Sequence, residues 1–165
     1  MTKRGGISIV RLGLIAGLIG VLLVALGVVA FLSDQASRRG PFDIAPYPEA
    51  VAWGTGNSST TSRELFYKVE GVPPDQVVRY YEQKLREHTG DNQAHCIRNP
   101  PTGEAPTTSA VPNFIPYQYI CLFDNAGFRA TQFTRVVIYP GYYHEDPFLN
   151  SQGQTVILYE QRWQS

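Results

Sequence analysis

The stretch RELFYKVEGVPPDQVVRYYEQKLREHTG, residues 63–90, decides the fold class. Residues 63–70 alternate between apolar and polar side chains, which is typical of a half-buried strand. Residues 71–75 then form a turn, with proline near the first helical turn and Asp75 at the positive end of the helix. The helix ends at Gly90. Its apolar stripe comprises Val77, Val78, Tyr81 and Leu85.

Further strand candidates lie on both sides of this stretch. They are rich in Val, Ile, Tyr and Phe, and they span residues 50–53, 94–98, 117–124, 131–139 and 155–163. Residues 124–127, DNAG, form a hairpin turn between two of them. The succession of strand, strand, helix and antiparallel meander predicts an α+β fold with two layers, an antiparallel sheet and one packed helix.

Residues 12–32 form an uncharged apolar run. As a helix this run would measure about 31 Å, which matches a hydrocarbon core of about 30 Å. A cleaved signal peptide is the alternative, since Lys3, Arg4 and Arg11 precede the run and residues 28–30 are small. The run exceeds the roughly 7–15 apolar residues of a signal peptide, so we expect an uncleaved anchor. The predicted organisation is a tail at 1–11, a transmembrane helix at 12–32, a tether at 33–48 and an exported α+β domain at 49–165.

Glycines repeat along one face of the predicted transmembrane helix. The set comprises Gly13, Gly17, Gly20 and Gly27, and its first two members form a GxxxG motif. Glycine lets helix backbones approach closely in lipid, although it is also common in transmembrane helices in general. We therefore expect membrane lipid and one protein partner around this helix. That partner is a larger membrane protein or a second copy of the chain.

Charge and cysteine content restrict the compartment and the partners. The chain has no net charge, but residues 41–165 carry nine basic and thirteen acidic residues, a net charge of −4, which disfavours nucleic-acid binding. Cys96 and Cys121 flank a proline-rich segment, and we expect a disulfide between them, which would persist only in an oxidising compartment. In a cytoplasmic domain both would instead be buried thiols. Three basic residues precede the apolar run and two follow it. We therefore expect a cell-membrane protein with a cytoplasmic N-terminus and an extracytoplasmic domain.

Two segments do not fit the sheet. Residues 100–116 contain five prolines, so we expect a long, partly disordered loop. Residues 139–150 are rich in both aromatic and turn-forming residues, which makes them a candidate contact loop or, alternatively, a flap that folds back over the open sheet face. The contact candidates are Tyr142, Tyr143, His144 and Phe148.

Known catalytic and cofactor motifs are absent from the sequence. It contains no GxGxxG, P-loop, GxSxG, CxxC or HExxH pattern. His144, Glu145 and Asp146 are consecutive, but neighbouring side chains in an extended chain point apart, so we assign no metal site. We expect no cofactor and assign no catalytic residue.

Residues 69–85, VEGVPPDQVVRYYEQKL, resemble a pattern in small, uncharacterised, single-pass exported bacterial domains tethered to a membrane. In that pattern a strand leads through a proline turn into a helix with aromatic and leucine positions, matched here by Tyr80, Tyr81 and Leu85. The resemblance implies an α+β domain and no particular activity.

These observations favour an accessory subunit without a cofactor, packed on a larger membrane protein complex through its glycine face. Respiratory and photosynthetic electron-transfer complexes commonly carry such subunits, so they are the expected context by analogy. The alternative is a membrane-tethered ligand-binding or sensor domain that uses the aromatic loop. An exported hydrolase with an unrecognised site is a third possibility.

Overall fold

The computed structural model describes residues 9–105, 114–127 and 130–165. The chain divides into two compact units, Met1–Ser37 and Arg38–Ser165, and each is described by itself. Residues 1–8 of the tail predicted at 1–11, and the centre of the proline-rich segment at 106–113, lie outside the described residues. Residues 9–11 of that predicted tail are helical.

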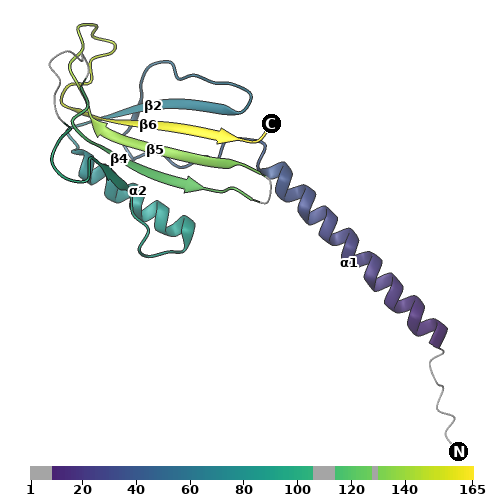
Figure 1. Cartoon of the computed structure of the whole chain (residues 1–165). Coiled ribbons are helices and arrows are strands. Elements are labelled where there is room, and N and C mark those ends of the chain that lie inside the picture. Colours follow the sequence, from purple (N-terminus) through teal and green to yellow (C-terminus); the bar gives the residue numbers. More distant parts are fainter. Residues whose placement is uncertain (1–8, 106–113, 128–129) are drawn as a thin grey trace, which may run out of the picture. The chain divides into compact units, whose positions relative to one another are not determined.

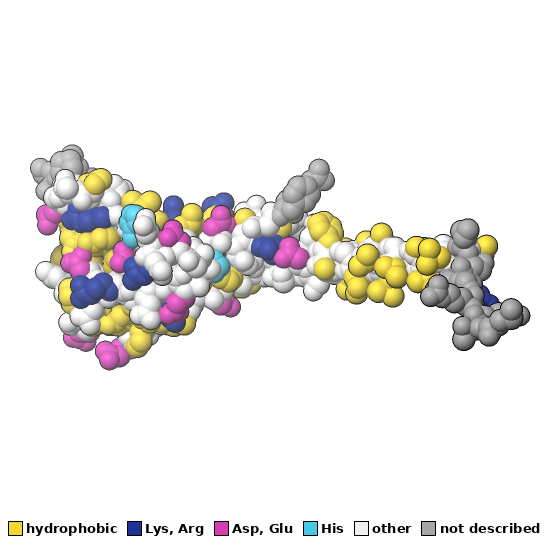
Figure 2. All heavy atoms as spheres, turned by 90° about the horizontal axis from the view of Figure 1, so that it is seen from below, with side chains coloured by type: hydrophobic (Ala, Val, Ile, Leu, Met, Phe, Trp, Pro, Cys, Tyr) yellow, Lys and Arg dark blue, Asp and Glu magenta, His cyan; other side chains and the backbone are white. Residues whose placement is uncertain are grey.

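The described residues of the first unit form the helix α1 (Ile9–Ser37) (Figure 1). Its best window has a mean hydropathy of 2.9, and the helix is long and apolar enough to cross a membrane. The large apolar side chains are exposed, from 47% at Phe31 to 71% at Val10. Figure 2 shows these hydrophobic side chains along the length of α1. Soluble monomers rarely leave so large an apolar surface in water, so the composition suits a lipid environment.

The second unit is an antiparallel sheet with one packed helix, which confirms the predicted α+β fold (Figure 1). In the described part of this unit six strands lie in the order β1-β2-β6-β5-β4-β3, so β3 to β6 form the expected meander and β2 joins it beside β6. The strands are β1 (Val51–Ala52), β2 (Ser62–Glu70), β3 (Ile97–Asn99), β4 (Gln118–Asp124), β5 (Gln132–Pro140) and β6 (Gln154–Trp163).

The helix α2 (Pro74–Thr89) covers one face of the sheet. It begins after Pro73, and Gly90 ends it with a left-handed φ of 70°, which glycine adopts without a steric penalty. Val77 and Tyr81 are fully buried, as the apolar stripe predicts. They pack on alternate residues of the strands, because side chains of a strand alternate between its two faces. The core on this face includes Phe123, Val136, Ile138, Ile157 and Tyr159.

Residues 40–48 pack along this same face, and we call them the strap. Phe42, Ile44 and Tyr47 contact the core, so the strap belongs to the folded unit. The predicted tether at 33–48 is therefore corrected: residues 33–37 continue α1, and the compact unit starts at Arg38. Residues 40–48 pack on the sheet because buried polar side chains of the sheet form hydrogen bonds with them. The composition of the strap does not reveal these bonds.

The amide of Gln161 is the centre of that bonding. Gln161 is 1% exposed, and its Nε2 donates to the carbonyl oxygen of Phe42 at 2.7 Å. Its Oε1 accepts from Nε of Arg63 at 2.8 Å. The hydroxyl of Thr134 also donates to the Phe42 carbonyl. A buried amide needs hydrogen-bond partners, so side chains of β5 and β6 determine which residues of the strap lie against them.

Two buried tyrosines hold the other half of the strap. The backbone N–H of Tyr47 donates to the hydroxyl of Tyr81 at 2.9 Å. The hydroxyls of Tyr81 and Tyr159 are 2.8 Å apart, and that of Tyr159 donates to the carbonyl of Ala45 at 3.3 Å. Because each hydroxyl has one proton, Tyr81 must donate to Tyr159. The chain of bonds therefore starts and ends on the strap.

Burial raises the pKa of Tyr81 and that of Tyr159 well above the usual value of 10. Burial also raises the pKa of Tyr139, on the opposite face of the sheet, to about 12. The charged phenolates are disfavoured in these sites because they would lose their hydration.

We expect the domain to lose stability as the pH rises above 10. A raised pKa in the folded state means that stability is unaffected below the unfolded pKa of about 10 and falls as the pH rises through the folded values. Denaturant unfolding of the full chain in detergent, between neutral pH and about 12, should show this fall together with a late rise in tyrosinate absorbance. A Tyr159→Phe variant should show a shallower fall of stability with pH than the wild type. Complete tyrosinate formation in the still-folded domain near pH 10 would contradict the prediction.

The predicted disulfide is present between Cys96 and Cys121. Cys121 lies on β4, and Cys96 immediately precedes β3, so the bond joins the two ends of the proline-rich segment. The base of this segment is closed further by the N–H of Ala105, which donates to the carbonyl of Pro116 at 2.7 Å.

Candidate interaction surfaces

The four glycines of α1 leave space on the helix surface. Gly13 and Gly17 form the floor of a shallow groove bordered by Leu14, Leu18 and Val21. Among the described residues, a Cβ atom built on Gly13, Gly17, Gly20 or Gly27 would meet nothing within 4 Å. The described part of this unit therefore does not require glycine at these positions. The surface is suited to close approach by a helix of another protein.

The loop at residues 141–153 joins β5 to β6 and is closed at its base. The N–H of Gly141 donates to the carbonyl of Gln154 at 2.7 Å, and the N–H of Ser151 donates to the carbonyl of Tyr142 at 3.1 Å. A Cβ on Gly141 would lie 1.8 Å from the Ser151 carbonyl oxygen, so only glycine permits this approach. We call this segment the aromatic loop.

The tip of the aromatic loop is held by polar groups. The N–H of Phe148 donates to Oδ1 of Asp146 at 2.9 Å, and the indole N–H of Trp53 donates to the Phe148 carbonyl at 2.7 Å. The N–H of Asp146 donates to Nδ1 of His144 at 3.0 Å. His144 and Asp146 thus take part in turns of the loop.

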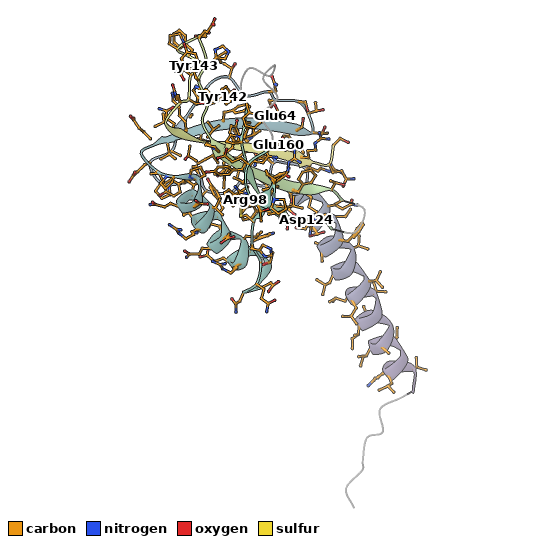
Figure 3. The ribbon with its side chains drawn as sticks, turned by 60° about the vertical axis from the view of Figure 1, so that its left-hand side comes forward. Glu64, Arg98, Asp124, Tyr142, Tyr143 and Glu160 are labelled. Atoms are coloured by element: carbon orange, nitrogen blue, oxygen red, sulfur yellow. A yellow bond between two sulfur atoms is a disulfide. The ribbon has the colours of Figure 1, made fainter. Side chains whose placement is uncertain are left out.

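The predicted contact residues separate into two groups. Tyr142 packs on the buried residues Val137, Tyr139 and Val156 of the open sheet face, as the folding-back alternative describes. Tyr143 and Phe148 do not, since they are 63% and 86% exposed. Figure 3 shows Tyr142 closer to the sheet and Tyr143 further out on the loop.

Carboxylates surround the aromatic loop. Glu145 and Asp146 belong to it, and Glu70, at the end of β2, is opposite Gln154 at the start of β6. Glu49 and Glu70 line one shallow depression with Lys68. The four carboxylates are in exposed residues, and within the described part of the chain none of them forms an ion pair. The Lys68 ammonium lies 5.6 Å from the Trp53 ring centre, in a cation–π contact.

The open face of the sheet also carries a shallow charged depression of about 410 Å³. Arg135 and Glu160 form an ion pair across β5 and β6 there, and this hydrogen bond raises the pKa of Arg135. Arg63, also in its lining, pairs with Asp43 of the strap. Among the described residues no group of three or more His, Cys, Asp or Glu side chains could hold a metal ion. The two ion pairs make Arg63, Arg135 and Glu160 parts of the fold.

Sequence reasoning missed several residues that shape these surfaces. Trp53 anchors the aromatic loop from a position 95 residues away, and no local pattern indicates that contact. Leu149 is 46% exposed beside Phe148. Gln161 and Thr134 could have been found, because both fall on inward positions of alternating strands.

Comparison of the chain with protein-family models, curated proteins and solved structures found no match. The resemblance of residues 69–85 to exported bacterial domains therefore stays a prediction. Function has to be argued from the surfaces themselves.

Proposed function

We propose that the chain is a single-pass membrane-anchored accessory subunit that packs on a larger membrane protein complex through the glycine face of α1. The observation that carries this proposal is the combination of a fully exposed apolar helix with four glycines along one face. Lipid offers no hydrophobic force between helices, so close backbone contact is what such a face can contribute.

The domain Arg38–Ser165 supports a role on the outer side of the membrane. Both cysteines are joined in the disulfide, and disulfides persist in oxidising compartments. We therefore propose that the N-terminus is cytoplasmic and the domain extracytoplasmic. An electron-transfer complex, respiratory or photosynthetic, is the proposed context by analogy with the small cofactor-free subunits of such assemblies.

Co-purification from the native membrane tests the proposal. Gly17→Leu and Gly20→Leu should each reduce recovery of the partner complex about tenfold after mild-detergent extraction, which corresponds to about 1.4 kcal/mol of association. The expected cause is the added side chain, which keeps the partner helix at a distance. Sizing and mass spectrometry of the co-migrating proteins provide the measurement.

Ala25→Leu is the matched control, because it adds similar bulk about 120° around the helix from Gly13. It should leave recovery unchanged. If the wild-type chain runs alone, or if the glycine variants recover the complex as well as Ala25→Leu does, the proposal fails. A wild-type dimer that the glycine variants dissociate would instead identify a second copy as the partner.

A further inference from the structure

The aromatic loop exposes apolar side chains on a backbone that is ordered without them. Its base is closed by Gly141, Ser151 and Gln154, and its tip by Asp146 and the Trp53 indole. The side chains of Tyr143, Phe148 and Leu149 are nevertheless 63%, 86% and 46% exposed. A pre-ordered loop binds at a low entropic cost, because little freedom is lost on contact.

The loop lies at the end of the sheet opposite to Arg38, where the chain starts the domain. Arg38 lies against Gly127, beyond the end of β4, since a Cβ on Gly127 would be 2.7 Å from its Nε. The aromatic loop follows the other end of β5, about 30 Å along the strand. Its exposed residues therefore belong to a surface of the domain remote from its first residue.

The charges around the loop indicate which kind of surface could bind to it. Glu49, Glu70, Glu145 and Asp146 are exposed, and within the described residues none of them forms an ion pair. Lys68 lines the same depression as Glu49 and Glu70, and the four carboxylates outnumber this one ammonium group. An anionic membrane surface would be repelled by them. A protein surface with Lys or Arg beside an apolar pocket would instead complement both the carboxylates and the apolar side chains.

A glycan is less well matched than a protein. Phe148 and Leu149 have no polar group to bond to sugar hydroxyls. Oδ1 of Asp146 accepts from the N–H of Phe148 and Oδ1 of Asn150 accepts from the N–H of Gln152, so these two oxygen atoms serve the turns of the loop. Aromatic residues that fill a pocket within a charged rim are instead common at the centre of protein interfaces.

We propose that the aromatic loop is a second docking site, in which Phe148 enters an apolar pocket of a protein whose rim carries Lys or Arg side chains. This site rests on the proposed function only in that the domain acts by binding. It does not require that α1 packs on the same partner.

Site-specific photo-crosslinking in native membranes tests this site on the full chain. A photoreactive phenylalanine analogue replaces Phe148, and the same analogue at Ile97, which is 65% exposed on β3, serves as the control. We expect a discrete protein adduct from position 148 and none from position 97. The cross-linked peptide should contain apolar residues next to Lys or Arg.

Charge reversal provides the second measurement. The double variant Glu70→Lys, Glu145→Lys should reduce the yield of the adduct about fivefold. This is the effect expected when two exposed ion pairs with the partner protein are lost. Glu87→Lys on α2 is the control and should leave the adduct unchanged. The site is refuted by an adduct to lipid or glycan, by the absence of a protein adduct, or by a yield that charge reversal does not alter. Because Gly17→Leu tests the helix separately, failure of the loop and failure of the glycine face are distinguishable.

Discussion

A fragment of residues 49–165 should be far less stable than a fragment of residues 38–165. The shorter fragment lacks the strap, and it therefore exposes the core positions that Phe42, Ile44 and Tyr47 cover. Each of these half-buried side chains contributes about 1 kcal/mol or more by burial. The buried partners of the strap, Gln161 and Tyr159 among them, also lose their acceptors.

The combined loss should reach about 5 kcal/mol, which is comparable to the total stability of many domains. We expect the fragment of residues 49–165 to show a broad, non-cooperative transition in denaturant, or none. The fragment of residues 38–165 should unfold cooperatively. Equal midpoints for the two fragments would show that the strap contributes nothing.

A single substitution separates the strap's bonding from its apolar contacts. Gln161→Leu keeps the size of the side chain but removes the amide that joins Phe42 to Arg63. We expect a loss of about 2–3 kcal/mol, because buried groups are left without partners. Gln152→Leu, in the exposed part of the aromatic loop, should change the stability by less than about 0.5 kcal/mol.

The strap also shows where sequence reasoning ends for this fold. The strands at 131–139 and 155–163 could be predicted because their periodicity is local, and the structure places β5 and β6 within a residue or two of them. The strap has no such periodicity, and the two side chains that bond to the Phe42 carbonyl come from residues 92 and 119 positions later. Composition alone therefore makes it resemble a linker.

The aromatic loop illustrates a different limit. Its composition indicated a surface, but it could not distinguish Tyr142, which folds onto the sheet, from Tyr143, which does not. The close approach of Gly141 to the Ser151 carbonyl closes the base of the loop, and composition alone does not show such a contact. The glycine face of α1 was visible in the sequence because helix periodicity is regular.

Reduction of the Cys96–Cys121 disulfide should lower the free energy of unfolding by about 3–4 kcal/mol. The bond closes a loop with a sequence separation of 25, and its loss restores chain entropy to the unfolded state. Cys121 is fully buried and Cys96 nearly so, in contact with the core under α2. For a domain of this size the melting temperature should fall by roughly 10–15 °C. Thermal unfolding of the full chain in detergent, with and without reductant, measures the difference.

A Cys96→Ala, Cys121→Ala double variant separates the effect of losing the disulfide from any other effect of the reductant on stability. It should be about as unstable as the reduced wild type, and reductant should not destabilise it further. If the reduced protein melts at the oxidised temperature, the loop between the cysteines is already restrained by the sheet, for example through Ala105 and Pro116.

The same bond tests the proposed compartment. Thiol labelling of denatured native membranes should modify neither cysteine before reduction and both after it. Labelling before reduction would place the domain in a reducing compartment, because a bond of this stability would otherwise stay formed.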